Sequence, residues 1–239
     1  MTFNIGNYTK LVQQAVHCFW GTRNEQLASQ ASRHRTDTGS RGAVTGGKQM
    51  DGFVTLLSKV AFDMGVPSEC IFTKQNQIPG YFRPTKDWDF LIVSPTGKLI
   101  AAIEFKSQVG SFGNNFNNRT EEALGSAVDL WTAFRENLFP NQNAPWVGYL
   151  MVIEKCEKST KVVKISKPHF NVLNEFKGTS YIDRYSILCR KLILERLYTS
   201  TALLWTSDAA TYGNVSSDIS IENFLSAFAG YIQGVAKEF

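Results

Sequence analysis

Residues 88–106 read WDFLIVSPTGKLIAAIEFK, and this stretch decides the fold. Two apolar runs, 90–93 and 99–105, flank the turn sequence Pro-Thr-Gly-Lys and therefore predict two antiparallel strands joined by a tight turn. With Thr96 and Gly97 as the central residues of the turn, each residue of the first strand acquires a defined partner in the second. We therefore expect this β-hairpin within the central sheet.

The predicted register brings three polar side chains together. Asp89 lies opposite Glu104, and Lys106, two residues further along the same strand, points to the same face. Carboxylates at this spacing can hold Mg²⁺, while a neighbouring ammonium group can orient or help to deprotonate an attacking water and offset negative charge. A plain surface pair is the alternative, but Glu104 and Lys106 end an apolar strand, where burying an unpaired charge is costly. Asp89, Glu104 and Lys106 are therefore the predicted catalytic residues, with Asp89 and Glu104 as metal ligands.

This spacing matches the PD-(D/E)XK pattern of nucleases. Glu104-Phe105-Lys106 supplies its second half and Asp89 its first. The proline is displaced, because Pro84 precedes Asp87 by three residues and Asp89 by five. Asp87 is the alternative first carboxylate, but it lies further from the apolar strand. The pattern therefore favours Asp89.

The next residues, 107–127, read SQVGSFGNNFNNRTEEALGSA. This segment closely resembles the signature region of the XhoI family of type II restriction endonucleases, and the similarity runs from about Asp87 to Glu136. Residues 41–47, RGAVTGG, also resemble the N-terminal part of that family. The resemblance implies a homodimeric, Mg²⁺-dependent enzyme that cuts double-stranded DNA at the palindrome CTCGAG. It also implies a cognate DNA methyltransferase that acts on the same site.

Polar residues beyond the hairpin suit DNA contact. Amide side chains can pair with adenine, and arginine with guanine, in the major groove. The basic, glycine-rich segment 33–48 suits a phosphate backbone, although a solvated loop would have the same composition. Asparagines also favour turns, so several could simply shape the loop predicted over 108–119. The predicted DNA contacts are Gln108, Asn114, Asn115, Asn117, Asn118, Arg119, Arg41 and Lys48.

Hydrophobic spacing and capping residues predict the remaining elements. The apolar run 146–153 is typical of a strand buried on both faces, and 203–205 suggests a further short strand. We therefore expect one α/β domain over 1–239, with a central mixed sheet flanked by helices, as in restriction-endonuclease-like folds. The expected helices are 9–31, 49–64, 118–138, 180–199 and one that begins at Ser220. The first two offer Glu25 and Asp51 as candidates to complete the metal site.

The overall composition constrains the function and location of the protein only weakly. The 239 residues carry a net charge of only +4, so a DNA-binding surface must be a local patch. The four cysteines show no metal-ligand spacing and indicate reduced thiols of a cytosolic protein. The N-terminal residues lack a basic region followed by an apolar core, and no apolar run approaches membrane length. We therefore expect a cytoplasmic protein with no signal peptide and no membrane contact.

Two other functions remain open on the sequence alone. A repair or recombination nuclease of the same fold would use the same trio but read DNA structure, and it would not cut a linear duplex at discrete sites. A non-catalytic DNA-binding module would bind without cutting. The intact trio argues against such a module, because a degenerate site has no reason to keep all three residues. The scattered histidines also count against an HNH nuclease.

Overall fold

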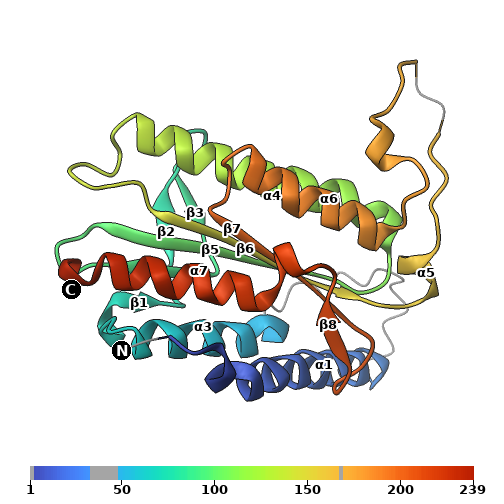
Figure 1. The fold of residues 1–239 in the computed structure, drawn as a ribbon, viewed down its shortest axis with the longest axis horizontal. Coiled ribbons are helices and arrows are strands. Elements are labelled where there is room, and N and C mark those ends of the chain that lie inside the picture. Colours follow the sequence, from blue (N-terminus) through green and yellow to red (C-terminus); the bar gives the residue numbers. More distant parts are fainter. Residues whose placement is uncertain (1–2, 33–47, 167–168) are drawn as a thin grey trace.

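A six-stranded mixed sheet forms the centre of the computed structural model, which describes residues 3–32, 48–166 and 169–239 (Figure 1). For residues 26–32 only the backbone is described. The strand order is β1-β4-β5-β6-β7-β8; β5, β6 and β7 run parallel, and the outer pairs are antiparallel. The strands are β1 (Ile71–Phe72), β4 (Phe90–Val93), β5 (Leu99–Gln108), β6 (Trp146–Glu154), β7 (Ser200–Thr206) and β8 (Tyr212–Asn214). A separate two-stranded sheet pairs β2 (Gln77–Pro79) with β3 (Thr85–Asp87).

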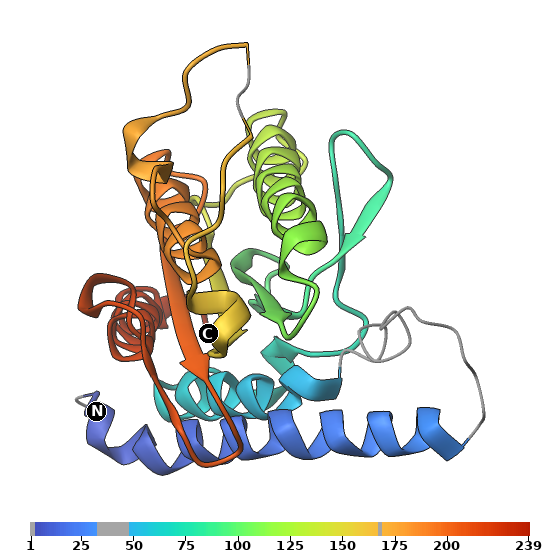
Figure 2. The same cartoon turned by 90° about the vertical axis from the view of Figure 1, so that its right-hand side faces the viewer.

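Helices cover both faces of the central sheet (Figures 1 and 2). One face carries α1, α3 and α7, and the other carries α4 and α6. Short α5 follows β6. The helices are α1 (Thr9–Ser32), α3 (Asp51–Asp63), α4 (Phe112–Arg135), α5 (Glu157–Thr160), α6 (Tyr181–Leu194) and α7 (Ile221–Gly234). The predicted α/β class, with a mixed sheet flanked by helices, is confirmed.

The central strands are buried on both faces, as the apolar run 146–153 predicted. In β5, Ile103 and Phe105 pack in the core beside α1, α3 and α7, whereas Ala102 packs in the core beside α4 and α6. Because side chains alternate along a strand, Glu104 and Lys106 belong to the face covered by α4 and α6. The alternation of β5 therefore decides on which side of the sheet the polar trio lies.

The β4–β5 hairpin keeps the predicted register at the end where the trio lies, but its turn differs by one residue. The amide of Gly97 donates to the carbonyl of Ser94 at 2.9 Å, so Pro95 and Thr96 occupy the central positions instead of Thr96 and Gly97. Gly97 has a φ of 82°, and the register shifts between Ile92 and Val93. A turn followed by a left-handed glycine and a bulge is a common way to join antiparallel strands.

Two predicted helix starts are confirmed in detail. The Ser180 hydroxyl accepts from the amide of Asp183, whose carboxylate in turn accepts from the Ser180 amide at 2.8 Å. Ser220 accepts from the amide of Asn223 at 3.2 Å. These caps satisfy amides that have no partner within the helix. Helix α6 ends at Leu194, earlier than predicted, and the chain enters β7 at Ser200.

Helix α4 begins at Phe112, so the predicted start at Asn118 and the predicted loop over 108–119 are wrong. Phe112 stacks on Tyr181, with ring centroids 5.8 Å apart, and Phe116 meets Tyr185 edge-on at 5.1 Å. These contacts with α6 stabilise a helical start that asparagine-rich sequence would not favour alone.

The remaining sequence predictions concern the basic segment 33–48, the four cysteines and membrane-spanning helices. Residues 33–47, which form most of the basic segment, lie outside the described residues. All four cysteines are free, and Cys70 and Cys189 are buried. No helix in the described part of the chain has both the length and the apolar character needed to cross a membrane.

Candidate active site

The trio lies at an open edge of the central sheet. Strand β4 begins at Phe90, which pairs with Ile103, so beyond Ile103 the described part of β5 pairs only with β6 within the sheet. Glu104 and Lys106 occupy this half-paired stretch. On the other side of β5, no strand of the described central sheet pairs with these residues, and the Asp89 carboxylate occupies the amide of Phe105 there.

Asp89 precedes β4 and turns its carboxylate toward β5. Its Oδ2 atom accepts a hydrogen bond from the amide of Phe105 at 2.6 Å, and Asp89 precedes Phe90, which pairs with Ile103. Burial, followed by the nearby negative charge of Glu104, raises the pKa of Asp89 to about 6. Two carboxylates that repel one another at a partly buried position are typical of a cation site.

Glu104 is the most buried member of the trio, with only 5% of the residue exposed. It bonds the ammonium group of Lys106 through Oε1 and that of Lys86 through Oε2, the latter at 2.8 Å. Burial opposes its ionisation, but the charges of Lys106 and Lys86 outweigh it and lower the pKa of Glu104. Glu104 is therefore an ionised carboxylate inside the protein.

Lys106 is held in its charged form. Burial alone would lower its pKa, but the negative charges of Glu104 and Asp89 outweigh that effect, and the pKa of Lys106 is raised. In this state the ammonium group donates hydrogen bonds and cannot accept a proton. Its chemistry here is that of a positive donor, suited to orienting a water molecule or a phosphate oxygen.

Sequence reasoning missed Lys86. This residue lies on β3, outside the central sheet, and its ammonium group sits 4.6 Å from the centre of the Trp88 ring. It also donates to the carbonyl of Asp87 at 2.9 Å. No sequence signal pointed to Lys86, because it reaches Glu104 from another sheet.

The hairpin that carries Lys86 is clamped to helix α4 by Asp129. This carboxylate, with 2% of the residue exposed, accepts from the amides of Tyr81 and Phe82 at 2.8 Å and from Nε of Arg83 at 2.6 Å. Burial is outweighed by these bonds, which lower the pKa of Asp129. A side chain at Gly80 would place its Cβ 2.5 Å from Oδ2 of Asp129. The tip of the hairpin is thus fixed.

A cavity of about 430 Å³ opens beside Asp89, and Asp51 also lines it, whereas Glu104 and Lys106 are not among its lining residues. Glu25, the other candidate, is exposed on α1 and is not among the lining residues. Asp87 is also exposed, on the last position of β3. The residues that line the cavity are Lys48, Met50, Asp51, Val54, Thr55, Thr73, Lys74, Asn76, Asp89 and Phe105.

Two carboxylates of the site could serve as ligands of a hard cation. Asp89 and Glu104 offer carboxylate oxygens, which Mg²⁺ and similar ions prefer, and such ions complete their coordination with water and substrate oxygens. In the residues that the structure describes, no three His, Cys, Asp and Glu side chains gather closely enough to form a ligand set by themselves. The protein residues therefore fit an ion held by two carboxylates.

Most of the predicted DNA contacts lie on helix α4 or at the end of β5, and not on a loop over 108–119. Gln108 is buried: its amide donates to the carbonyl of Gly110, and the Tyr185 hydroxyl donates to its Oε1 atom at 3.4 Å. The other described candidates lie on the first turns of α4 and on the short helix 48–50. Asn114, Asn117, Asn118 and Lys48 are exposed and Asn115 is half-buried, while Arg41 lies outside the described residues.

Arg119 is engaged within the protein. Its guanidinium group bonds the carboxylate of Glu122 at 2.6 Å, and 15% of its side chain is exposed. The charge of Glu122 also contributes to the raised pKa of Lys106. The guanidinium group of Arg119 therefore already has a carboxylate partner.

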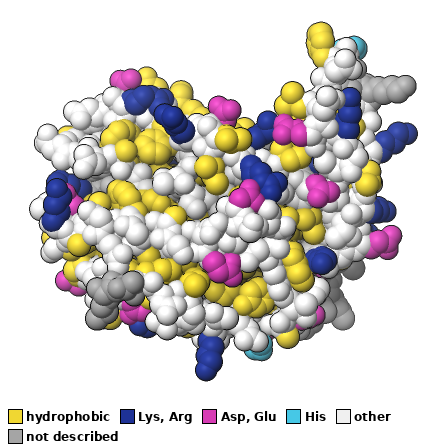
Figure 3. Space-filling view, in the orientation of Figure 1, with side chains coloured by type: hydrophobic (Ala, Val, Ile, Leu, Met, Phe, Trp, Pro, Cys, Tyr) yellow, Lys and Arg dark blue, Asp and Glu magenta, His cyan; other side chains and the backbone are white. Residues whose placement is uncertain are grey.

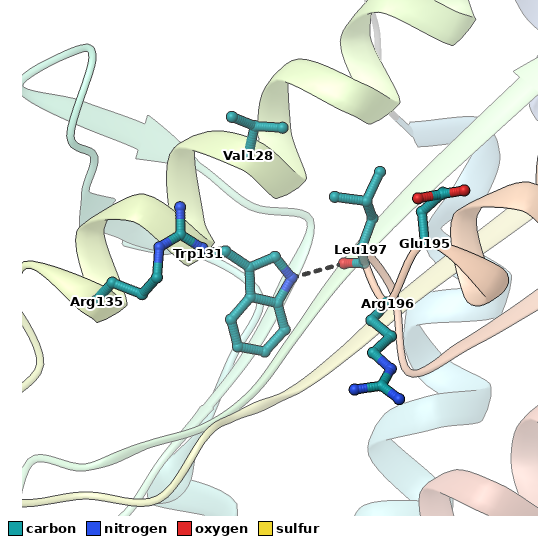
Figure 4. Close-up of a pocket in the computed structure, with 6 residues that line it drawn as sticks. All are labelled: Val128, Trp131, Arg135, Glu195, Arg196 and Leu197. Carbon is teal, nitrogen blue, oxygen red and sulfur yellow. Dashed lines mark hydrogen bonds between the residues drawn. The ribbon is translucent and has the colours of Figure 1, made fainter.

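A second cavity lies away from the trio. A cavity of about 360 Å³ lies between the C-terminal half of α4 and the turn after α6, where Trp131 donates to the carbonyl of Leu197 at 2.8 Å (Figure 4). It contains none of the predicted catalytic residues. On the face shown in Figure 3, the described basic and acidic side chains are interspersed and form no single-sign patch.

Comparisons with known proteins identify the family of the chain. The family model described as restriction endonuclease XhoI matches residues 29–217. The chain is 52% identical to the type II restriction enzyme BstVI of Geobacillus stearothermophilus, with 79% of this chain and 89% of that enzyme covered. It is 46% identical to the type II restriction enzyme XhoI of Xanthomonas vasicola, with coverage of 82% and 79%.

A third relative, the type II restriction enzyme AbrI of Azospirillum brasilense, is 43% identical, with 71% of this chain and 77% of the relative covered. No solved structure matches the chain. The family model spans the whole hairpin and the segment 107–127 that follows it. The chain belongs to the XhoI family of restriction endonucleases, which are site-specific endonucleases.

Proposed function

We propose that this chain is a type II restriction endonuclease that cleaves both strands of duplex DNA at a palindrome, with Mg²⁺ held by Asp89 and Glu104. The observation that carries the proposal is the convergence of Asp89, Glu104 and Lys106 at the open edge of β5. Family membership supports the same reaction class. The palindrome that the family resemblance implies is CTCGAG.

Each member of the trio has a distinct proposed role. Asp89 and Glu104 supply oxygen ligands, and Asp51, on the shared cavity, is the proposed additional carboxylate. Bound Mg²⁺ would supply a Lewis acid that polarises the scissile phosphate. Lys106, as a charged donor, would orient the attacking water and offset the negative charge that develops on the phosphate. The products would carry 5′-phosphate and 3′-hydroxyl ends.

Exposed residues near the site are the proposed DNA contacts. Asn114, Asn117 and Asn118 on α4 could pair with base edges, and Lys48 lines the cavity beside Asp89. Arg119 would need to leave Glu122 to reach a base, and Arg41 remains a prediction from the sequence. A palindrome has two equivalent scissile bonds, so we propose a symmetric dimer with one site in each subunit and one nuclease domain over 1–239. A methyltransferase would protect the same DNA sequence.

A plasmid digest tests the proposal. We expect Mg²⁺ to convert unmethylated plasmid into discrete fragments, EDTA to stop the reaction, and end sequencing to place every cut within CTCGAG. Fragment ends should ligate without prior phosphorylation. The control is the same plasmid with one base pair of each site changed, which should stay intact. Cuts that share no sequence would indicate a structure-reading nuclease, and binding without cutting under any divalent metal would indicate a non-catalytic module.

A second experiment identifies the first carboxylate. Asp89→Asn should lower the single-turnover cleavage rate by several orders of magnitude, because it removes an anionic ligand that faces Glu104. Asp87→Asn is the matched control, since Asp87 is exposed and only its backbone carbonyl bonds Lys86. We expect this variant to cut at close to the wild-type rate. The reverse pattern would transfer the role to Asp87.

A further inference from the structure

Both carboxylate oxygens of Glu104 already have ammonium partners. Lys106 donates to Oε1, and Lys86 donates to Oε2 at 2.8 Å. The three side chains are shielded from solvent, with exposed fractions of 6% for Glu104, 10% for Lys86 and 18% for Lys106. The PD-(D/E)XK pattern accounts for Lys106 but gives Lys86 no role.

The two lysines are held by different parts of the fold. Strand β5, which carries Lys106, pairs with β6 from Ala101 to Gln108. Lys86 lies on β3, which has three residues and pairs only with the equally short β2. A two-stranded hairpin is marginally stable by itself, and here the Asp129 carboxylate fixes its tip while Asn76 and Trp88 bond at its base. Lys86 is therefore the partner that Glu104 can lose without disturbing the central sheet.

The four charged groups compensate one another. With both carboxyl groups ionised, Asp89 and Glu104 contribute negative charges, and Lys86 and Lys106 balance them. A divalent cation needs free oxygen lone pairs and a negative surrounding. An ammonium group on Glu104 opposes both requirements.

We propose that Lys86 is a positioning residue that holds Glu104 in the metal-free protein and competes with the divalent cation for its Oε2 atom. The inference rests on the metal site proposed above. Removing the ammonium group while keeping the length of the side chain should free one oxygen and leave the site with a net negative charge. A lysine with a purely structural role would affect stability without strengthening metal binding.

Calorimetric titration of the free protein with Mg²⁺ alone, in the absence of DNA, tests this role. Lys86→Met should lower the Kd for Mg²⁺ by at least about tenfold, and Lys86→Arg, which keeps the charge, should stay close to wild type. Lys98→Met is the matched control: Lys98 pairs with Glu238 at 2.8 Å and lies about 20 Å along β5 from Glu104. As a second readout, Mg²⁺ should raise the thermal unfolding midpoint more in Lys86→Met than in wild type.

The outcomes separate this role from the metal site itself. If Glu104→Gln binds Mg²⁺ as tightly as wild type, the metal site is misplaced and the role of Lys86 falls with it. If Glu104→Gln weakens binding but Lys86→Met leaves the Kd unchanged or raises it, the metal site stands and Lys86 does not compete for it. Should Lys86→Met fail to fold, Lys86→Gln replaces it, and the same fall in Kd is expected.

Discussion

Replacing Glu104 with glutamine, or Lys106 with alanine, should reduce DNA cleavage by several orders of magnitude and leave sequence-specific binding largely intact. Both residues would act on the scissile phosphate, whereas specificity comes from contacts with base edges. Glutamine keeps the shape of Glu104 but removes the charge that binds a cation. Alanine removes the donor, while Glu104 keeps Lys86 as a partner. Single-turnover cleavage and gel-shift binding to the same duplex measure the two effects separately.

Glu238→Gln is the control for this pair of variants. Glu238 also bonds a lysine, Lys98, but near the turn of the hairpin and away from the trio. We expect its cleavage rate to match wild type within a few-fold. If either Glu104→Gln or Lys106→Ala still cuts at close to the wild-type rate, the trio is not the catalytic centre.

A methyl group at Gly148 should destabilise the whole domain. Gly148 lies in β6 between two parallel neighbours, and its added Cβ would lie 2.9 Å from Cη2 of Trp146, closer still to the neighbouring ring carbon, and 2.9 Å from Cζ of Phe224. Both rings are buried, so neither can move into solvent. Gly148→Ala should therefore lower the free energy of unfolding by about 1–3 kcal/mol or more, as for other overpacked cores. Urea unfolding followed by circular dichroism measures the change.

Gly125→Ala provides the contrast. Gly125 is exposed on α4, and a Cβ there meets nothing within 4 Å. Alanine is the better helix former, so this variant should be more stable than wild type by about 0.5–1 kcal/mol. Equal stability of the Gly148 and Gly125 variants would contradict the packing around β6.

Local sequence rules predicted the elements whose causes are local. The hairpin register follows from two apolar runs around a turn, and the helix starts at Ser180 and Ser220 follow from side chains that bond nearby amides. The start of α4 could not be predicted in this way. Asparagines disfavour helix when considered alone, and the contacts of Phe112 and Phe116 with α6 override that preference.

The candidate site likewise contains residues that local rules predicted and one, Lys86, that they did not. Glu104 and Lys106 were predictable because they are two residues apart on one strand, and Asp89 because a hairpin fixes its partner. Lys86 was not predictable, because it reaches Glu104 from a hairpin of two three-residue strands. Such short strands have no apolar alternation to reveal them.

The edge of β5 beyond Ile103 bears on how the folded protein avoids pairing of this strand with a strand of another chain. A strand edge with unpaired backbone groups can add a strand from another chain, and inward-pointing charges are one natural protection against such pairing. Here Asp89 occupies the amide of Phe105, and the charged side chains of Glu104 and Lys106 flank it. A foreign strand would have to displace Asp89 from that amide and leave its carboxylate without this partner. The side chains proposed to cut DNA thus also guard this edge against intermolecular β-sheet formation.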